Sequence, residues 1–342
     1  IYLIDWNSFI YRMFFWLPEF STKDWKVVNA IFGMAKFFVW QLAQEKPDYL
    51  IFIKDARWTN FRHELYSEYK ATRDRMPDNL REQIWDIENI IKEMGIDIVE
   101  IPWYEADDVI WTLAEKYDWI AEYEVDILTW DKDLYSLVSE NIKIYDTMKK
   151  KKFWLDETKE KFWVDSNMII DYLAIVWDKS DNIPWIDWFW PKKAIWLINE
   201  IWSVEKIYIE VDKIVSWEKS FTDYDKEIQS CFKWKTYEKL TISKDNAFLS
   251  KKLATLDKWV VLEDFSLDNF LFTPDTLVSD EVKSLFRQFE FHSLLQEEKQ
   301  ELKSWKDLWL SVKIVWDTLW LEELINKTKT YKNISLDTET TS

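Results

Sequence analysis

The stretch Ile1-Tyr-Leu-Ile-Asp5, followed by Trp6-Asn-Ser8, decides the fold that this sequence predicts. Four apolar residues end on a carboxylate, as in a buried strand whose last residue faces a ligand site. Similar runs recur through the first half of the chain. The expected strands are 1–5, 49–53, 96–101, 125–129 and 142–145, and the helical patterns between them include 29–45, 80–94 and 106–116. Strands that alternate with helices predict the α/β class, with a central mostly parallel sheet covered by helices on both faces.

The second half of the chain has a different pattern. No strand pattern follows residue 155, and segments 167–176, 192–201 and 203–211 have helical periodicity. A polar, charged stretch then precedes another apparent α/β beginning. We therefore expect an α/β core over 1–165, a helical subdomain over 166–292, a linker over 293–311 and the truncated start of a further domain over 312–342.

Composition and charge limit the class of protein. A chain of 342 residues suits two domains better than one small core, and its single cysteine, Cys231, excludes a disulfide framework and fits a reducing cytosol. No apolar run has the length needed to cross a bilayer, so we expect no membrane association. The net charge of −18 argues against a nucleic-acid partner. That argument fails if the acidic side chains bind divalent cations, which invert the local field.

Tryptophan and glycine occur in unusual numbers. The chain has 25 Trp and 2 Gly, whereas an ordinary chain of this length has about 24 Gly. Some Trp residues lie where turns require glycine, as Trp25 does in Lys-Asp-Trp-Lys. We hypothesise that many of these Trp stand for Gly, because a UGA codon that some bacteria read as glycine would be written as Trp by another code. Trp40, on an apolar helical stretch, fits a genuine tryptophan. A Trp-rich carbohydrate binder is the alternative, and it leaves the missing turn glycines unexplained.

Nine acidic residues occupy the ends of the expected elements. In a parallel sheet, side chains that follow the carboxyl ends of strands meet at one edge. Residues three apart on a helix also share a face, and acidic pairs of that spacing open one helix and follow another. The nine are Asp5, Asp55, Glu105, Asp107, Asp108, Asp131, Asp133, Asp178 and Asp181.

So many carboxylates in one place predict a metal site. Their repulsion would favour protonation unless cations neutralise them, and hard oxygen ligands select magnesium or manganese. Two such ions about 4 Å apart can clamp the attacking water and the leaving oxygen of a phosphodiester. Each acidic residue alone has a simpler explanation, since acids suit the first turn of a helix and Asp is common in turns. Their joint placement favours a site.

At this point the residues match a known family. The chain resembles the 5′-nuclease domains of bacterial DNA polymerase I, within the wider flap-endonuclease family with its PIN-like fold. The matching stretches are Leu3-Ile-Asp-Trp-Asn-Ser8, Phe61-Arg-His-Glu64, Tyr69-Lys-Ala-Thr-Arg73, Glu105-Ala-Asp-Asp-Val-Ile110, Asp131-Lys-Asp-Leu134 and Asp178-Lys-Ser-Asp-Asn-Ile-Pro184. The family pattern has glycine at the positions of Trp6, Trp103, Trp111, Trp130, Trp177, Trp185, Trp188 and Trp190.

The resemblance implies roles for individual residues. All nine acids would hold two Mg²⁺ or Mn²⁺ ions. Lys70 and Arg73 match basic residues of a helical arch near 65–95 and would stabilise charge on the scissile phosphate. Arg62 and Tyr69, from the locally basic stretch 57–81, would contact DNA. The stretch 182–194 looks like a helix–three-turn–helix, where Lys192, Lys193 and a K⁺ ion would bind duplex phosphates.

The implied activity is hydrolysis of phosphodiester bonds at 5′ ends and flaps of branched DNA and at RNA–DNA primer junctions, in replication and repair. Asp337 and Glu339, in Ser-Leu-Asp-Thr-Glu, resemble the first motif of a 3′–5′ exonuclease domain, which favours a polymerase over a stand-alone nuclease. We expect a monomer in the bacterial cytoplasm, associated with the nucleoid. Two alternatives stay open: a single-strand ribonuclease on the same scaffold, and a non-catalytic DNA-binding module.

Overall fold

In the computed structural model the described residues are 1–56, 60–176, 181–183, 190–232 and 234–295, together with 322, 325, 326 and 329. The chain divides into two units, Ile1–Leu295 and Gln296–Ser342. The first unit contains every element discussed below. The expected linker and further domain lie almost wholly outside the described residues, as do Asp337 and Glu339.

A six-stranded sheet forms the centre of the first unit, with strand order β3-β2-β1-β4-β5-β6. All neighbouring pairs are parallel except β5 with β6. The five expected strands are confirmed within one or two residues at each end, and the short β6 was not expected. The strands are β1 Tyr2–Asp5, β2 Leu50–Lys54, β3 Ile98–Glu100, β4 Val125–Leu128, β5 Ile142–Asp146 and β6 Lys151–Phe153.

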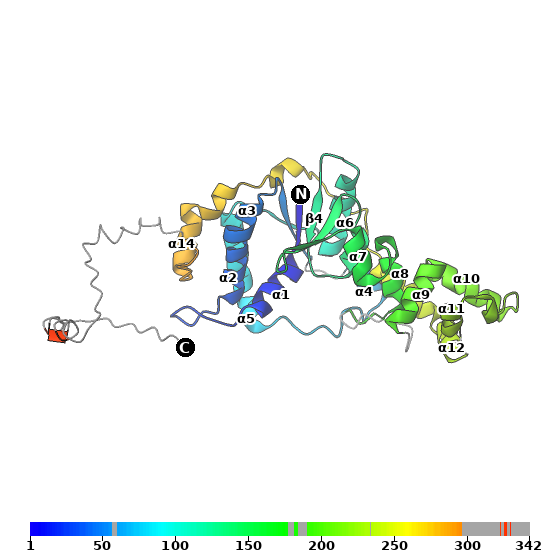
Figure 1. The fold of residues 1–342 in the computed structure, drawn as a ribbon. Helices are drawn as coiled ribbons and strands as arrows, with labels where there is room; N and C mark the ends of the chain where they lie inside the picture. Colours follow the sequence, from blue (N-terminus) through cyan, green and yellow to red (C-terminus); the bar gives the residue numbers. More distant parts are fainter. Residues whose placement is uncertain are drawn as a thin grey trace. The chain divides into compact units, whose positions relative to one another are not determined.

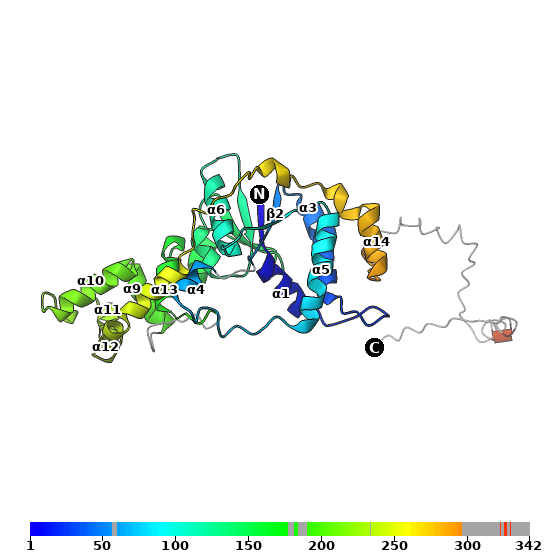
Figure 2. The same ribbon diagram turned by 180° about the vertical axis from the view of Figure 1, so that it is seen from behind.

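Side chains that alternate along β1 define two apolar layers. Leu3 packs with the α6 side, whereas Tyr2 and Ile4 pack with the helices that precede β2 and with α5. Successive strand residues point to opposite faces, so a central strand must be apolar throughout. Figures 1 and 2 show α2 and α5 on one side of the sheet and α6 and α7 on the other. The expected doubly covered sheet is confirmed.

The helices of the sheet region follow the predicted patterns. The expected helix 29–45 is continuous in space but changes to a π-helical turn in its middle, a feature often found at functional sites. These elements are α1 Trp6–Trp16, α2 Asn29–Lys36, the π-helical turn η1 Phe37–Leu42, α3 Ala43–Glu45, α4 Phe61–Leu65, α5 Asp78–Glu93, α6 Ala106–Asp118, η2 Asp133–Leu137, α7 Leu155–Phe162 and η3 Ser166–Met168.

A helical region follows, as expected, and the chain then returns to the sheet. After α13 the backbone N–H of Phe272 donates to the carbonyl of Asp48, and α14 buries Val282 and Phe286 in the same apolar layer as α5. The helical elements are α8 Ile169–Ile175, α9 Pro191–Ile201, α10 Val204–Val215, η4 Phe221–Asp223, α11 Lys226–Cys231, α12 Trp234–Ile242, α13 Lys244–Ala254, η5 Leu267–Phe270, η6 Pro274–Val278 and α14 Asp280–Gln288.

The segment between α4 and α5 differs from the helical arch expected near 65–95. Residues 66–77 form turns and extended chain, and the helix begins only at Asp78. Lys70 has φ of 56°, which interrupts any helix, and its backbone N–H donates to the carbonyl of Asp181 rather than to its own segment. The segment runs beneath the carboxyl end of the sheet, from α4 to α5 (Figure 1).

Within the described part of the chain, no helix is long and apolar enough to cross a membrane.

Among the residues that the structure describes, five tryptophans adopt backbone conformations that favour glycine. Each has φ between 61° and 82°. Each side chain is more than half exposed, so the indole gains little by packing. They are Trp25 (φ 64°), Trp103 (73°), Trp163 (61°), Trp202 (82°) and Trp217 (62°). Trp163 and Trp202 directly follow α7 and α9, where a left-handed residue ends a helix.

Two of these positions match turn motifs that ordinarily contain glycine. At the end of α10 the N–H of Glu218 donates to Lys213 and that of Trp217 to Ile214, which is the Schellman pattern with Trp217 in the glycine position. Trp103 follows Pro102 in a turn closed from Tyr104 to Ile101, as glycine does in a type II turn. These conformations support the glycine hypothesis. Trp6, in contrast, is fully buried against Phe52.

Replacing Trp217 by glycine is therefore expected to raise the free energy of unfolding by about 1 kcal/mol, because a left-handed conformation strains any residue with a Cβ atom. Trp85 is the matched control, since it is also largely exposed but lies inside α5. Trp85→Gly should lower stability by about 1 kcal/mol. Chemical denaturation of both variants measures this, and equal effects of the two substitutions would contradict it. UGG codons at these five positions would refute the codon hypothesis.

Candidate active site

A cleft of about 960 Å³ opens at the carboxyl end of the sheet. It lies where the strand order reverses, beside β1 and β4, which is the usual ligand position in an open parallel sheet. Its walls include four of the nine predicted carboxylates, namely Asp5, Asp55, Asp107 and Asp131. Residues of the segment 70–77 also line it. The structure thus brings together side chains that are separated by up to 126 positions in the sequence.

Strand ends and helix starts hold these carboxylates in place. Asp5 ends β1 and accepts hydrogen bonds from the N–H of Ser8 (3.2 Å) and the hydroxyl of Thr129 (2.8 Å). Asp55 follows β2 and accepts from the N–H of Ala106 (2.6 Å), so it also fixes the start of α6. These local bonds explain why the carboxylates stay at the rim although they repel one another.

Asp131 and Asp133 lie in the turn after β4. The N–H of Asp131 donates to Thr129 Oγ1 (3.0 Å), and the N–H of Asp133 donates to Asp131 Oδ1 (3.0 Å). Asp131 lines the cleft, whereas Asp133 begins η2. This turn therefore presents one carboxylate directly and holds the second just behind it.

Burial and nearby negative charges raise the pKa values of two of the cleft carboxylates, Asp5 and Asp107. Burial first, and then the nearby charges of Asp55 and Asp131, raise the pKa of Asp5 to about 7. Burial and the charges of Asp131, Asp5 and Asp55 also raise the pKa of Asp107 well above its usual range. The raised pKa values of Asp5 and Asp107 mean that a cation bound in the cleft would stabilise their charged forms.

The donor set fits divalent ions in chemistry, since carboxylate oxygens are the ligands that Mg²⁺ and Mn²⁺ prefer. Among the residues that the structure describes, however, no three acidic, histidine or cysteine side chains are gathered tightly enough to hold an ion as they stand. Asp5, Asp55, Asp107 and Asp131 nevertheless line one cleft, and carboxylate side chains change rotamer more easily than strands move. Asp178 lies outside the described residues.

Three further predicted carboxylates are paired with basic side chains. Lys70 Nζ lies 2.6 Å from Glu105 Oε1, and Arg73 forms an ion pair with Asp181. Asp108 is fully buried and forms an ion pair with Arg62 (2.7 Å). Lys70 and Arg73 also line the cleft, so two basic side chains lie near the cleft carboxylates. Glu105, Asp108 and Asp181 are not themselves among the residues that line it.

The residues expected to contact DNA differ in their exposure to solvent. Arg62 and Tyr69 are buried, with exposed fractions of 0% and 4%, so neither offers a surface to DNA in this conformation. The hydroxyl of Tyr69 donates to Glu105 and Asp181 instead. Lys192 and Lys193 lie in the first turn of α9, where Lys192 is exposed. The preceding stretch 184–189 is outside the described residues.

Sequence reasoning missed several side chains that line the cleft. Asn7, Ser8, Tyr11 and Phe15 all project from α1 into it. Their spacing follows one helical face that begins at the Asp5 cap, and this periodicity was the available signal. The Tyr11 and Phe15 rings are neighbours (6.2 Å between centroids), and the Phe15 side chain is 69% exposed. The cleft therefore has an aromatic side as well as an acidic one.

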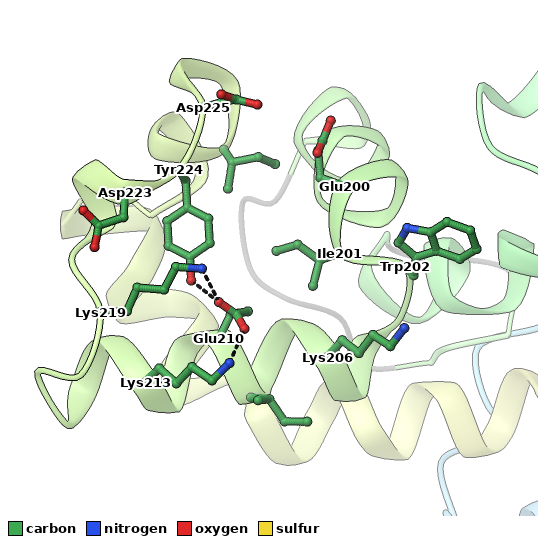
Figure 3. Close-up of a pocket in the computed structure, with 12 residues that line it drawn as sticks. Glu200, Ile201, Trp202, Lys206, Glu210, Lys213, Lys219, Asp223, Tyr224 and Asp225 are labelled. Atoms are coloured by element: carbon green, nitrogen blue, oxygen red, sulfur yellow. Dashed lines mark hydrogen bonds and ion pairs between the residues drawn. The ribbon is translucent and has the colours of Figure 1, made fainter.

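A second cavity, of about 610 Å³, lies in the helical region between α9, α10 and the turn after them. Figure 3 shows Glu210 at its centre, bonded to Lys213 (2.7 Å), Lys219 (2.8 Å) and the Tyr224 hydroxyl. Glu210 is thus paired with two lysines. The second cavity has none of the carboxylate crowding of the first cleft, so we do not regard it as the active site.

Comparison with known protein families accounts for most of the chain. Residues 1–163 match the family model described as 5′-3′ exonuclease, N-terminal resolvase-like domain. Residues 164–276 match the model described as 5′-3′ exonuclease, C-terminal SAM fold.

The curated proteins similar to this chain include 5′-3′ exonucleases and DNA polymerases I. A 5′-3′ exonuclease of Aquifex aeolicus is 35% identical over 297 residues, which cover 87% of this chain and 94% of that protein. A DNA polymerase I of Caldicellulosiruptor bescii is 36% identical over 74% of this chain and 28% of its own length. A DNA polymerase I of Pseudomonas aeruginosa is 32% identical over 99% of this chain and 37% of its own length. The chain thus spans about a third of the polymerases that it matches.

Solved structures show the same fold. A zinc-bound T5 5′-exonuclease superposes with a TM-score of 0.57 at 18% identity, covering 85% of this chain and 98% of that one. The catalytic core of Rad2 in complex with a DNA substrate superposes with a TM-score of 0.57 at 14% identity, covering 86% of this chain and 91% of that one.

The bonds of Glu210 predict a pH-dependent contribution to stability. Burial opposes ionisation there, but the donors Lys213, Lys219 and Tyr224 outweigh it and lower the pKa of Glu210 from 4.5 to about 2. A lowered pKa stabilises the fold above about pH 4.5 and loses that effect as the pH falls towards 2. Glu210→Gln should cost about 1–2 kcal/mol at pH 7 and nothing near pH 2.

Urea unfolding at several pH values measures this effect. Glu200→Gln is the matched control, because Glu200 lines the same cavity but is exposed. A loss of stability that is the same at both ends of the pH range would count against the proposed bonding.

Proposed function

The chain belongs to the 5′-3′ exonuclease family, and we propose that it hydrolyses phosphodiester bonds at 5′ ends and flaps of branched DNA. The observation that carries this proposal is the cleft itself. Asp5, Asp55, Asp107 and Asp131 line one cleft at the carboxyl end of the sheet, and Lys70 and Arg73 line the same cleft. A cleft lined by both carboxylates and basic side chains suits a phosphodiester held by metal ions.

We propose that the four cleft carboxylates hold the metal ions, with Glu105, Asp133, Asp178 and Asp181 as nearby ligands. Magnesium or manganese fits these oxygen donors, and in such sites a pair of divalent ions supplies an activated water and stabilises the leaving oxygen. Solved relatives support this proposal, since a T5 flap endonuclease structure is described as a pseudo-enzyme–product complex with DNA and metal ions. A K⁺ ion at the hairpin 182–194 remains part of the proposal.

The chain's own cations would act on the phosphate. Lys70 has a raised pKa because the charge of Glu105 outweighs the effect of burial, so it stays protonated beside the cleft. The guanidinium of Arg73 is held near the cleft by Asp181. Both groups are pre-positioned and need little reorganisation to stabilise negative charge as it develops on the scissile phosphate. The segment 70–77 would then orient the strand over the carboxylates.

Duplex DNA would bind to the helical region beside the cleft. Pro191 occupies the first turn of α9, which is favourable for a helix start, and Lys192 and Lys193 follow it. Helix N-termini and lysines both attract phosphate. We therefore propose a division of labour in which the region 166–292 holds the duplex and the core 1–165 cuts the 5′ strand.

The matches favour a nuclease region of a DNA polymerase I over a stand-alone nuclease. The Pseudomonas aeruginosa polymerase matches 99% of this chain, whereas the Aquifex aeolicus exonuclease matches 87%. We propose that residues 312–342 belong to a 3′–5′ exonuclease domain, with Asp337 and Glu339 as ligands. In this setting the activity would remove RNA primers and flaps in the bacterial cytoplasm, with the enzyme acting as a monomer at the nucleoid.

The direct test is cleavage of a labelled 5′-flap duplex with and without magnesium. Asp107→Asn is expected to lower the cleavage rate about 100-fold or more, because Asp107 lies among the proposed ligands. Asp97→Asn is the control. Asp97 is an exposed acid that precedes β3, so it lies at the amino end of that strand, whereas the cleft lies at the carboxyl end of the sheet. Faster cutting of unbranched single-stranded RNA would favour the ribonuclease alternative. Binding without cutting would favour a DNA-binding module.

Lys70→Met is expected to lower kcat about 100-fold with little change in KM, because its charge would act mainly in the transition state. The exposed Lys149 gives a matched control in Lys149→Met. Single-turnover kinetics on the flap substrate separate the two constants. A rise in KM alone would mean that Lys70 only binds DNA.

A further inference from the structure

Arg62 uses every donor of its side chain inside the protein. Its Nη1 donates to Asp108 Oδ2 (2.8 Å) and Glu105 Oε2 (3.2 Å), and Nη2 donates to Asp108 Oδ1 (2.7 Å). Nη2 and Nε also donate to the carbonyls of Thr255 (3.3 Å) and Leu253 (2.9 Å). With 0% of its surface exposed, Arg62 has neither a free donor nor access to a phosphate in this conformation.

Asp108 is saturated in the same way. Besides the two bonds from Arg62, its Oδ1 accepts the backbone N–H of Asp257 (2.7 Å) and its Oδ2 accepts that of Glu105 (3.3 Å). Asp108 is also 0% exposed. Four donors occupy the carboxylate, and a metal ion could bind it only if a buried arginine lost its partner.

We propose that Arg62 and Asp108 are positioning residues, forming a buried clamp that touches neither DNA nor metal. The clamp sets the first turn of α6, where Glu105, Asp107 and Asp108 follow one another closely. Because Asp108 is fixed towards the interior, Asp107 is presented to the cleft. This inference rests on the proposed nuclease function and corrects the expectation that Arg62 contacts DNA and Asp108 binds an ion.

The clamp also joins the two working parts of the molecule. The carbonyls of Leu253 and Thr255 and the N–H of Asp257 lie at and just after the end of α13, which packs against α8 in the helical region. The same guanidinium therefore contacts the start of α6 and the end of α13. We infer that it maintains the register between the duplex-binding region and the carboxylate cleft.

The salt dependence of DNA binding tests whether Arg62 contacts phosphate. A labelled 5′-flap duplex is titrated with the full chain in calcium, over a range of salt concentrations. Loss of one phosphate contact reduces the slope of log K against log salt by about 0.9. The clamp predicts no change in slope for Arg62→Met, whereas Lys192→Met should reduce it. A reduced slope for Arg62→Met would overturn the proposal, and an unchanged slope for Lys192→Met would instead count against the proposed duplex site.

The conservative variant Arg62→Lys separates charge from geometry and serves if Arg62→Met does not fold. A lysine keeps the positive charge but cannot make the five bonds of the planar guanidinium. The clamp predicts that kcat falls about 10-fold or more while KM is unchanged. Cleavage at the wild-type rate would show that charge alone suffices and would overturn the proposal. Arg81→Lys is the control, since Arg81 forms an exposed ion pair with Asp78.

Manganese binding to the full chain tests Asp108 without requiring cleavage. The clamp predicts that Asp108→Asn binds the same number of Mn²⁺ ions as wild type, whereas Asp107→Asn loses an ion or about 10-fold in affinity. It also predicts a lower melting temperature for Asp108→Asn. Arg62→Met/Asp108→Asn should be no less stable than the weaker single variant. Loss of an ion in Asp108→Asn at an unchanged melting temperature would overturn the clamp.

Discussion

Repulsion among the carboxylates at the carboxyl end of the sheet is the constraint on which the rest of the structure depends. Asp5, Asp55, Asp107 and Asp131 share one cleft, and burial, together with the nearby charges of Asp55 and Asp131, raises the pKa of Asp5 to about 7. An isolated protein tolerates such crowding only when rigid elements fix the groups and cations balance them. Here β1, β2, β4 and α6 fix them, and the reversal of strand order brings these ends together. Repulsion among the carboxylates lowers local stability, and the same negative field attracts the metal ions that the proposed hydrolysis requires.

The surrounding charges divide into two sets that act differently. Lys70 and Arg73 lie at the cleft and retain partial access, with side-chain exposures of 15% and 43%. Arg62 is enclosed and fully bonded, so its charge balances Asp108 and Glu105 within the protein. A buried ion pair gives little net stability, but removing one partner is severely destabilising. Such a pair is therefore better suited to fixing geometry than to strengthening the fold.

The sequence predicts the sheet and its acidic edge well, because both depend on short-range patterns. The apolar run that ends at Asp5 predicts a buried strand with a polar residue at its end. The family pattern matches the same stretch. The burial of Arg62 could not be predicted, because its partners at Leu253 and Thr255 are about 190 positions away. The turns at 66–77 were also missed, since the bond from the N–H of Lys70 joins it to Asp181, a residue distant in the sequence. Long-range contacts override local helix propensity in such segments.

The backbone conformation at several tryptophans is one that glycine normally adopts. At Pro102-Trp103 and at the end of α10, the hydrogen-bond patterns are those of turns that glycine makes without strain. An indole there is exposed and contributes no packing to offset the strained φ. The acidic edge shows no such conflict, because Asp5 and Glu105 cap helices as acidic residues commonly do. Positive φ also occurs at non-tryptophan residues such as Lys70 and Asn182. At the exposed tryptophans, however, it falls in turn motifs that ordinarily contain glycine, which argues that the fold belongs to a chain with glycine in those turns.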